Sequence, residues 1–402
     1  MKKASILAIL LIGPLAFGQV TVPNSFWGVQ IHDPSSMYPV PSGPVFNVVR
    51  LWDTATGWAD MVDGNPCTPP LPSYDYTVFD QWGMKYADLG SAAPAIIYTV
   101  AKTPCLLSSN PADSTCSDGG QGRCDPPKDI TCTGSAAGGT GGTDDYFKNF
   151  LSGLWRHIKS RSYYATIPQW YVEIWNEPDT PGFWDNTWIA KQCQDPNAPY
   201  RFLVRMAADA KTTIQGIDSK VQFLTPPVND PLTQVKAPNG WWYNYLLQGG
   251  YNYADVASVH GYMHQDVHHE PIEDLCCDPN NSLVGEARST MAMFFPSGTP
   301  LFLTEGSYGG KNPHNPSDDV AFTGEYYTLA LSGPGLVNNL DWYAWDITSP
   351  LWDGSSLTGS GKAVAVMQQR WGYKGARFDA TGCASSSASR QTRMERASLA
   401  TE

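Results

Sequence analysis

Short apolar runs alternate with segments of helical periodicity along most of the chain. Runs of this kind, separated by helices, predict parallel strands that are joined by helical crossovers. We expect eight such strands, at residues 27–32, 45–52, 95–100, 170–175, 221–225, 256–262, 301–304 and 340–345.

The clearest predicted helix covers residues 143–160. Thr143 is a favourable N-cap residue, and Asp144 and Asp145 suit the positive N-terminal end of a helix. Apolar residues then recur three and four positions apart and form one stripe: Phe147, Phe150, Leu151, Leu154, Trp155 and Ile158. A second stripe runs from Leu203 to Ile214, and weaker helices are expected at residues 76–89, 241–248, 284–295, 320–331 and 363–371. The crossover between the first two strands contains no convincing helix.

Eight strands with interleaved helices predict a (β/α)₈ TIM barrel of the α/β class, spanning residues 19–377. No GxGxxG pattern follows the first strand, which argues against a doubly wound dinucleotide-binding sheet. Residues 102–142 form a long Cys-rich insertion after the third strand. Residues 378–402 are rich in Ala, Ser and Arg without apolar periodicity, and we expect a disordered or truncated tail there.

Residues 1–18 have the features of a secretory signal peptide. Lys2 and Lys3 precede an apolar run, and Ala16-Phe17-Gly18 fits a cleavage site. The run is too short for a confident membrane span. We therefore expect a secreted or periplasmic protein that begins at Gln19 and has no membrane anchor after cleavage.

The overall charge restricts the partners. The formal net charge is −12, and no basic stripe is present that could neutralise phosphates, so we expect no nucleic-acid binding. Acidic polysaccharides would also be repelled, and a neutral glycan fits better. The 15 Trp and 20 Tyr residues suit sugar stacking and core packing equally well, so their number does not decide the function.

Nine cysteines in an exported chain indicate disulfides rather than a metal cluster. Eight of them fall in expected loops that follow strands, on the face of the barrel where the strands end: Cys67, Cys105, Cys116, Cys124, Cys132, Cys193, Cys276 and Cys277. We expect disulfides that staple these loops around a substrate cleft. Cys383 lies alone in the tail and is expected to remain unpaired.

Two carboxylates lie at the ends of expected strands. Glu177 follows the fourth strand, and Glu305 follows the seventh. The carboxyl ends of parallel barrel strands meet at one face, which is where barrel enzymes place their active sites. Two carboxylates that face each other there match the needs of glycosidic cleavage, in which one protonates the leaving oxygen and the other attacks or activates water.

The segment Ile174-Trp175-Asn176-Glu177-Pro178 resembles the Asn-Glu-Pro signature of glycoside hydrolase clan A, whose members are retaining barrel enzymes. Leu303-Thr304-Glu305-Gly306 resembles the nucleophile strand of that clan. The similarity is closest to families 39 and 5 and covers most of residues 27–371. It implies that Glu177 is the acid/base and Glu305 the nucleophile, that no cofactor is needed, and that the substrate is an oligo- or polysaccharide.

The same resemblance implies further site residues. Arg50 would lie beside the nucleophile, Asn176 would bond the sugar 2-hydroxyl, and Tyr262 of the His260-Gly261-Tyr262 segment would bond the nucleophile. Trp345 would form the floor of the sugar subsite, and His32 would touch the sugar. The chain departs from the pattern in two ways. Its tail is too short and too polar for us to expect the β-sandwich that family 39 enzymes often build from the chain ends, and the insertion after the third strand is not a clan feature that we recognise.

Several residues allow another interpretation. Glu173 shares a strand face with Glu177 and could compete for the acid role, but its deeper position favours a buried structural partner. Arg50 could form an ordinary salt bridge, and His260 could be a core histidine. Glu270 and three histidines could bind a metal or lie in a solvated loop: His264, His268 and His269. Trp184, Trp188, Trp241 and Trp242 could be sugar platforms or packing residues.

The sequence thus predicts a secreted retaining glycoside hydrolase that cleaves β-linked, neutral plant-type glycans by double displacement. The pKa of Glu177 should be raised because Glu305 is anionic nearby. Two alternatives are a catalytically inactive barrel that binds glycans and a metal-dependent hydrolase that uses the His264 cluster. The former would usually lack one carboxylate, and both are present.

Overall fold

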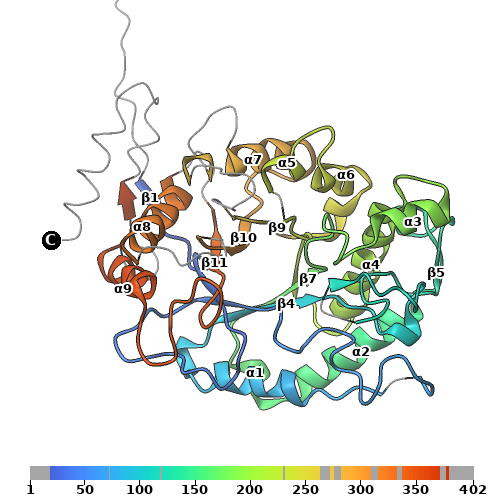
Figure 1. Ribbon diagram of the computed structural model, residues 1–402, viewed down its shortest axis with the longest axis horizontal. Helices are drawn as coiled ribbons and strands as arrows, with labels where there is room; N and C mark the ends of the chain where they lie inside the picture. Colours follow the sequence, from blue (N-terminus) through green and yellow to red (C-terminus); the bar gives the residue numbers. More distant parts are fainter. Residues whose placement is uncertain are drawn as a thin grey trace, which may run out of the picture.

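The computed structural model describes residues 19–71, 73–117, 120–229, 231–262, 272–275, 282–308, 316–332, 337–371 and 377–379. Eight parallel strands within these residues form a barrel (Figure 1), and each matches an expected strand. They are β2 (Trp27–Gln30), β3 (Val48–Leu51), β4 (Ala95–Val100), β7 (Trp170–Ile174), β8 (Gln222–Leu224), β9 (Ala257–His260), β10 (Leu301–Gly306) and β11 (Asn339–Trp342).

The strands are hydrogen-bonded in the order β8-β7-β4-β3-β2-β11-β10-β9. A parallel bridge between Leu224 and Val256 joins the two ends of this sheet and closes the barrel. The predicted (β/α)₈ barrel is therefore confirmed.

Helices surround the barrel (Figure 1), and every predicted helix is present. The helices within the described residues are α1 (Thr77–Ala87), α2 (Asp145–Ser160), α3 (Asn186–Cys193), α4 (Ala198–Gln215), α5 (Pro231–Gln234), α6 (Trp241–Leu247), α7 (Leu283–Phe294), α8 (Pro316–Ser332) and α9 (Gly359–Trp371), of which α3 and α5 were not predicted. The chain between β2 and β3 contains no α-helix, as expected. The predicted apolar stripe of α2 is wholly buried against the barrel. No helix within the described ranges combines the length and apolar character needed to cross a bilayer.

The prediction that Thr143 caps α2 is wrong. The N-cap residue is Asp144, which has a left-handed φ of 53° and whose side chain makes no capping hydrogen bond. Asp129 supplies the cap instead, because its Oδ2 accepts a hydrogen bond of 3.2 Å from the backbone N–H of Tyr146. The same oxygen accepts one of 3.3 Å from the Thr143 hydroxyl. The capping group thus comes from the insertion and not from the residues next to the helix.

The two ends of the described chain meet outside the barrel. Strand β1 (Gln19–Thr21) pairs in antiparallel fashion with β12 (Arg377–Asp379). The last two residues of β12 fall in the segment that was expected to be a tail. The expected signal peptide, residues 1–18, and residues 380–402 lie outside the described residues.

Disulfides cross-link the Cys-rich insertion and its neighbours. Cys67 pairs with Cys105, Cys116 with Cys124, and Cys132 with Cys193. The insertion also contains a short hairpin of β5 (Ile130–Thr131) and β6 (Gly141–Gly142). The prediction of disulfides among the loop cysteines is confirmed for these six residues. Cys276, Cys277 and Cys383 lie outside the described residues.

Candidate active site

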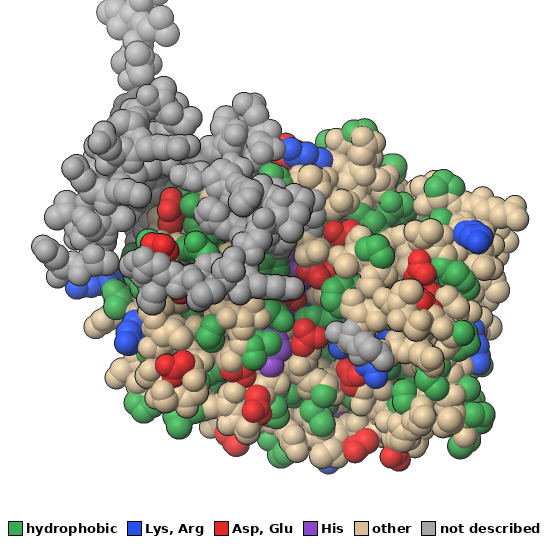
Figure 2. Space-filling view, in the orientation of Figure 1, with side chains coloured by type: hydrophobic (Ala, Val, Ile, Leu, Met, Phe, Trp, Pro, Cys, Tyr) green, Lys and Arg blue, Asp and Glu red, His purple; other side chains and the backbone are tan. Residues whose placement is uncertain are grey.

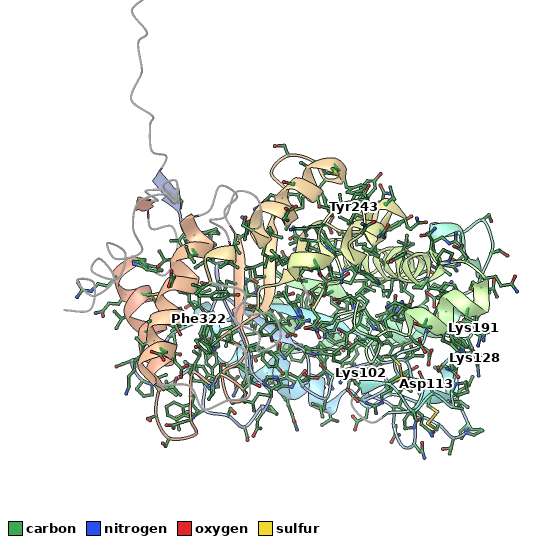
Figure 3. All side chains as sticks on the ribbon, turned by 45° about the horizontal axis from the view of Figure 1, so that its top comes forward. Lys102, Asp113, Lys128, Lys191, Tyr243 and Phe322 are labelled. Atoms are coloured by element: carbon green, nitrogen blue, oxygen red, sulfur yellow. A yellow bond between two sulfur atoms is a disulfide. The ribbon has the colours of Figure 1, made fainter. Side chains whose placement is uncertain are left out.

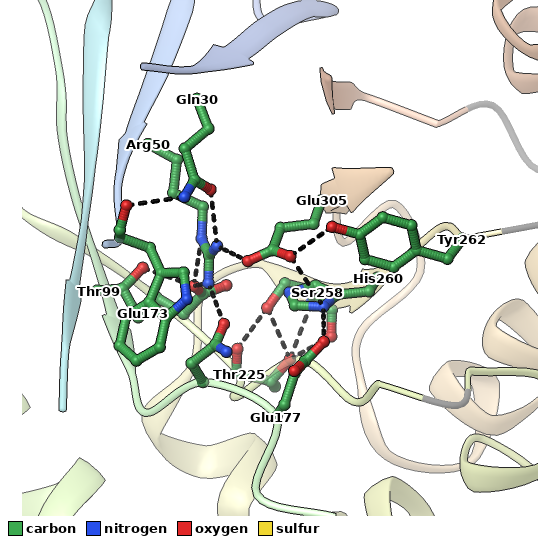
Figure 4. A network of polar contacts seen from close by, with 12 residues as sticks. Gln30, Arg50, Thr99, Glu173, Glu177, Thr225, Ser258, His260, Tyr262 and Glu305 are labelled. Atoms are coloured by element: carbon green, nitrogen blue, oxygen red, sulfur yellow. Dashed lines mark hydrogen bonds and ion pairs between the residues drawn. The ribbon is translucent and has the colours of Figure 1, made fainter. Parts of the chain in front are cut away.

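Glu177 and Glu305 come together at the carboxyl end of the barrel (Figure 4). Glu177 follows β7, and Glu305 lies near the end of β10. One carboxylate oxygen of each residue and a ring nitrogen of His260 all lie within 4.8 Å of one another. Both carboxylates are largely buried, since Glu177 is 8% exposed and Glu305 is 4% exposed.

A strained turn delivers Glu177 to this position. Trp175 and Glu177 have φ values of 75° and 44°, which non-glycine residues seldom adopt. The buried Trp175 ring holds the turn in place. Its Nε1–H donates a hydrogen bond of 2.6 Å to the carbonyl oxygen of Phe183, and the ring packs edge-on against Trp184. Such backbone strain concentrates at functional sites, where the surrounding packing over-determines it.

Arg50 connects three groups of the site. This fully buried guanidinium from β3 donates to a carboxylate oxygen of Glu305. Its Nε donates to Oε2 of Glu173 at 2.8 Å, and its Nη2 donates to Oδ1 of Asn176 at 2.7 Å. Glu173 also accepts a hydrogen bond of 2.8 Å from the Thr99 hydroxyl and is fully buried. Glu173 is therefore the interior partner of Arg50 and cannot serve as the acid for a bound sugar.

Glu305 is held from two sides. Arg50 contacts its Oε1, and the Tyr262 hydroxyl donates a hydrogen bond of 2.7 Å to its Oε2 (Figure 4). Burial raises the pKa of Glu305 above its ordinary value, while the charge of Arg50 and the hydrogen bond from Tyr262 lower that pKa. These two donors stabilise the ionised form of the carboxylate.

Glu177 has a different environment. The pKa of Glu177 is raised to about 8, chiefly by burial; the charge of Arg50 opposes the shift, and the negative charges of Asp53 and Glu173 contribute to it. The direction agrees with the sequence-based prediction, but the cause differs. Burial is the main cause, whereas the prediction relied on the charge of Glu305. A carboxyl group with such a pKa is mostly protonated at neutral pH.

His260 contacts the acid candidate directly. Its Nδ1 lies 2.8 Å from Oε1 of Glu177, and its ring is fully buried. Burial lowers the pKa of His260 to about 4, so the ring is neutral at pH 7. The resemblance to clan A also placed His260 among the substrate-binding residues; the contact that the structure gives this ring is with Glu177, which it orients.

The structure does not bring Trp345 to the site, so its expected role as the floor of the sugar subsite is wrong. The ring is fully buried, its Nε1–H donates to the carbonyl oxygen of Met37 at 3.0 Å, and it packs against Tyr38 and Trp352. The physical reason is that β11 ends at Trp342, three residues earlier than expected. Residue 345 therefore lies beyond the strand end that faces the cleft.

Tyr343 is the aromatic residue beside the site that the sequence did not indicate. It is the first residue after β11, is only partly buried, and packs edge-on against His32 and Tyr262. His32 itself is partly buried and is oriented by Asp346, which lies 3.1 Å from its Nδ1. If the end of β11 had been predicted at Trp342, Tyr343 would have been recognised as the first residue beyond the strand and as a candidate for the site.

Three of the tryptophans that could have been either sugar platforms or packing residues are packing residues. Trp184, Trp241 and Trp242 are at most 5% exposed, so their faces are not available to a sugar. Trp188 is partly buried and packs at the edge of the core.

Among the residues that the structure describes, two groups have the residue types of a metal site. The first is Glu177, His260 and Glu305. Arg50 already provides a positive charge to Glu305 there, and a second cation would be repelled. In the second group, Asp113 and Asp125 accompany Cys116 and Cys124, whose sulfur atoms are joined in a disulfide and are not thiolates. The His264 cluster lies outside the described residues.

No protein-family model matches the chain, and no curated protein matches it. Among solved structures, the chain is similar to a GH39 enzyme from Xanthomonas axonopodis pv. citri, with 17% identity, a TM-score of 0.59, and coverage of 88% of this chain and 68% of that one. It is also similar to a GH39 β-xylosidase from Caulobacter crescentus, with 15% identity, a TM-score of 0.57, and coverage of 87% and 72%.

A GH30 endoxylanase from Clostridium papyrosolvens C71 shows 10% identity and a TM-score of 0.52, with coverage of 90% of this chain and 75% of that one. At these identities the likeness concerns the fold. The chain thus has the barrel architecture of these glycoside hydrolases.

Proposed function

We propose that this protein is a retaining glycoside hydrolase that cleaves β-linked glycans by double displacement. The observation that carries the proposal is the close approach of Glu177 and Glu305, of which one oxygen each lies within 4.8 Å. Retaining enzymes separate their two carboxyl groups by about 5–5.5 Å, whereas inverting enzymes leave about 6.5–9.5 Å for a water molecule. The spacing here supports retention.

In the first step, ionised Glu305 attacks the anomeric carbon, and a bond forms between its oxygen and that carbon. The glycosidic bond breaks at the same time, and the leaving oxygen takes the proton of Glu177. The contrasting environments support these roles, because Arg50 and Tyr262 stabilise the anion of Glu305 and burial keeps Glu177 protonated.

In the second step, Glu177 acts as a base. It takes a proton from water, the resulting hydroxide attacks the anomeric carbon, and Glu305 leaves as a carboxylate. Both groups return to their starting protonation states, so the reaction needs no cofactor.

His260 determines which oxygen of Glu177 transfers the proton. A neutral His260 that carries its proton on Nδ1 donates to Oε1 of Glu177 at 2.8 Å. Oε2 then carries the proton that reaches the glycosidic oxygen. Asn176 supports the sugar in a similar way, since Arg50 occupies its Oδ1 and fixes the amide group beside Glu177.

The substrate is a neutral glycan of the plant-wall type. The chain carries a net charge of −12, which disfavours acidic polysaccharides. On the face seen in Figure 2, Lys and Arg side chains are scattered singly among the described residues. Similar folds include a β-xylosidase and an endoxylanase. The signal-like N-terminal segment and three disulfides support export to an oxidising compartment.

A screen of aryl β-glycosides and soluble plant-wall polysaccharides tests the proposal. Proton NMR of the first product would then report its anomeric configuration before mutarotation. We expect cleavage of at least one β-linked substrate with release of the β-anomer. Release of the α-anomer would contradict the double-displacement mechanism.

A further inference from the structure

An open depression of about 560 Å³ adjoins the candidate active site. It falls within the size range of small-molecule sites, which is about 300–1,000 Å³. The loops that follow β3 and β4 form its walls, so it lies on the same face of the barrel as Glu177 and Glu305. The residues that line it are Asp53, Ala55, Ala59, Asp60, Val62, Gly64, Pro66, Lys102 and Arg123.

Charged side chains of alternating sign follow the wall of this depression. The Lys102 ammonium lies 3.6 Å from a carboxylate oxygen of Asp53 and 3.6 Å from one of Asp60. Arg123 donates to Asp60 at 2.7 Å. All four side chains are partly exposed, from 11% for Lys102 to 33% for Asp53. The row therefore presents fixed donors and acceptors without a net charge, which suits the hydroxyl groups of a neutral sugar.

The row of charged side chains begins beside Tyr343, an aromatic residue at the edge of the candidate site. Asp53 lies 3.5 Å from the hydroxyl of Tyr343, and Tyr343 packs against Tyr262, the donor to Glu305. The negative charge of Asp53 also acts on Glu177. The Trp52 ring lies beneath the Lys102 ammonium, 4.7 Å from its centre, and is buried, so it supports Lys102 from below and does not line the depression. A molecule held at the two carboxylates can thus continue into the depression.

Disulfides hold both walls. Cys67 follows the wall residue Pro66 and is bonded to Cys105, which ties the loop after β3 to the loop after β4. The bond between Cys116 and Cys124 fixes the segment that carries Arg123. Figure 3 places Lys102 and Asp113 in the same part of the molecule, with disulfides beside Asp113. Such cross-links preorganise the wall, which reduces the entropy lost when a ligand binds.

We propose that the Cys-rich insertion and the loop after β3 form an additional sugar-binding subsite, which accepts a unit of the glycan chain beyond the bond that is cleaved. This inference rests on the proposed hydrolase function. It assigns Lys102, Arg123 and Asp60 to recognition of chain hydroxyls. The enzyme then favours oligosaccharides of three or more units over short aryl glycosides.

The test compares kinetics on an aryl monoglycoside and on the matching β-linked oligosaccharides of two to five units. The variants are Lys102→Met and Arg123→Met, and Lys191→Met is the control because Lys191 is exposed on α3, outside the depression. In the wild type, kcat/KM should rise with chain length. Lys102→Met and Arg123→Met should each raise KM for the longest chain by about tenfold. The KM for the aryl substrate should rise much less in these variants. Lys191→Met should leave both KM values unchanged.

Two results would overturn the subsite. One is a wild-type kcat/KM that does not depend on chain length, and the other is an equal change in KM for the aryl and the long substrates. If the wild type cleaves no substrate at all, the proposed function fails. Isothermal titration of the five-unit oligosaccharide into wild type and Lys102→Met then measures binding in the depression directly. Weaker binding by the variant supports the subsite, and equal binding or no binding by either protein refutes it.

Discussion

The Tyr262 hydroxyl donates a hydrogen bond of 2.7 Å to Oε2 of Glu305, while Arg50 occupies the other oxygen of that carboxylate. The two donors come from different parts of the barrel, since Arg50 lies on β3 and Tyr262 follows β9. Glu305 is therefore fixed in orientation and stabilised as an anion at the point where a nucleophile is needed.

Replacing Tyr262 tests the effect of this hydrogen bond. Tyr262→Phe removes a donor that lowers the pKa of Glu305, so that pKa should rise. The acid limb of the kcat/KM profile should move to higher pH, and kcat should fall by about 10- to 100-fold. Tyr164→Phe is the control, because Tyr164 bonds Asp218, outside the candidate site. An unchanged acid limb in Tyr262→Phe would argue against Glu305 as the ionised group.

Replacing Glu177 tests its role as the acid. Glu177→Ala should reduce turnover of substrates with poor leaving groups by about 10²–10⁴-fold, because general acid catalysis contributes that much. Substrates with activated leaving groups need little protonation and should lose far less in the first step. Azide should partly restore activity, since the cavity left by the side chain admits a small nucleophile.

The control for this variant is Glu286→Ala, which removes a partly exposed carboxylate on α7. It should leave both classes of substrate unaffected. Equal losses on good and poor leaving groups in Glu177→Ala, without rescue by azide, would show that Glu177 is not the acid.

The pH dependence follows from the two carboxyl environments. The pKa of Glu305 is raised above its ordinary value of 4.5, and that of Glu177 is raised to about 8, in both cases chiefly by burial. The proposed mechanism requires ionised Glu305 and protonated Glu177. The kcat/KM profile should therefore rise as the pH passes the pKa of Glu305 and fall as it passes about 8. In Glu177→Ala with an activated substrate, the alkaline limb should disappear. Its persistence would assign that limb to another group.

The fold and the two carboxylates could be predicted because they depend on regular features. Apolar runs determine the strands, and in a closed parallel barrel every strand ends at the same face. Glu177 and Glu305 thus share a face whatever the details of the loops. The place of Arg50 beside Glu305 was implied by the resemblance to clan A.

The remaining parts of the site depend on where each element ends and on contacts distant in sequence. Trp345 was misplaced because the end of β11 lies at Trp342, and the apolar run continues past it. The α2 cap was missed because Asp129, 17 positions before the bonded N–H of Tyr146, provides it. The row of charged side chains in the depression was also missed, because Asp53 and Lys102 meet only after two loops fold together.

The disulfides yield a prediction for the loops. Non-reducing peptide mapping should recover the pairs Cys67–Cys105, Cys116–Cys124 and Cys132–Cys193. Loss of the first pair in a Cys67→Ser/Cys105→Ser variant should cost about 2–4 kcal/mol in the free energy of unfolding. Cys383→Ser should leave the melting temperature unchanged, because that cysteine is expected to be unpaired. Alkylation of the six paired cysteines without reduction would refute the pairing.

In the proposed mechanism, Glu305 forms a covalent bond with the sugar during turnover. A 2-deoxy-2-fluoro β-glycoside with an activated leaving group slows both steps, and the second step more, so the intermediate accumulates. Incubation with the wild type followed by peptide mass spectrometry measures where the sugar is attached. We expect one added glycosyl group per chain, on the peptide that contains Glu305, and none in Glu305→Gln. Attachment at another residue, or the absence of any adduct on a protein that cleaves the parent glycoside, would contradict it.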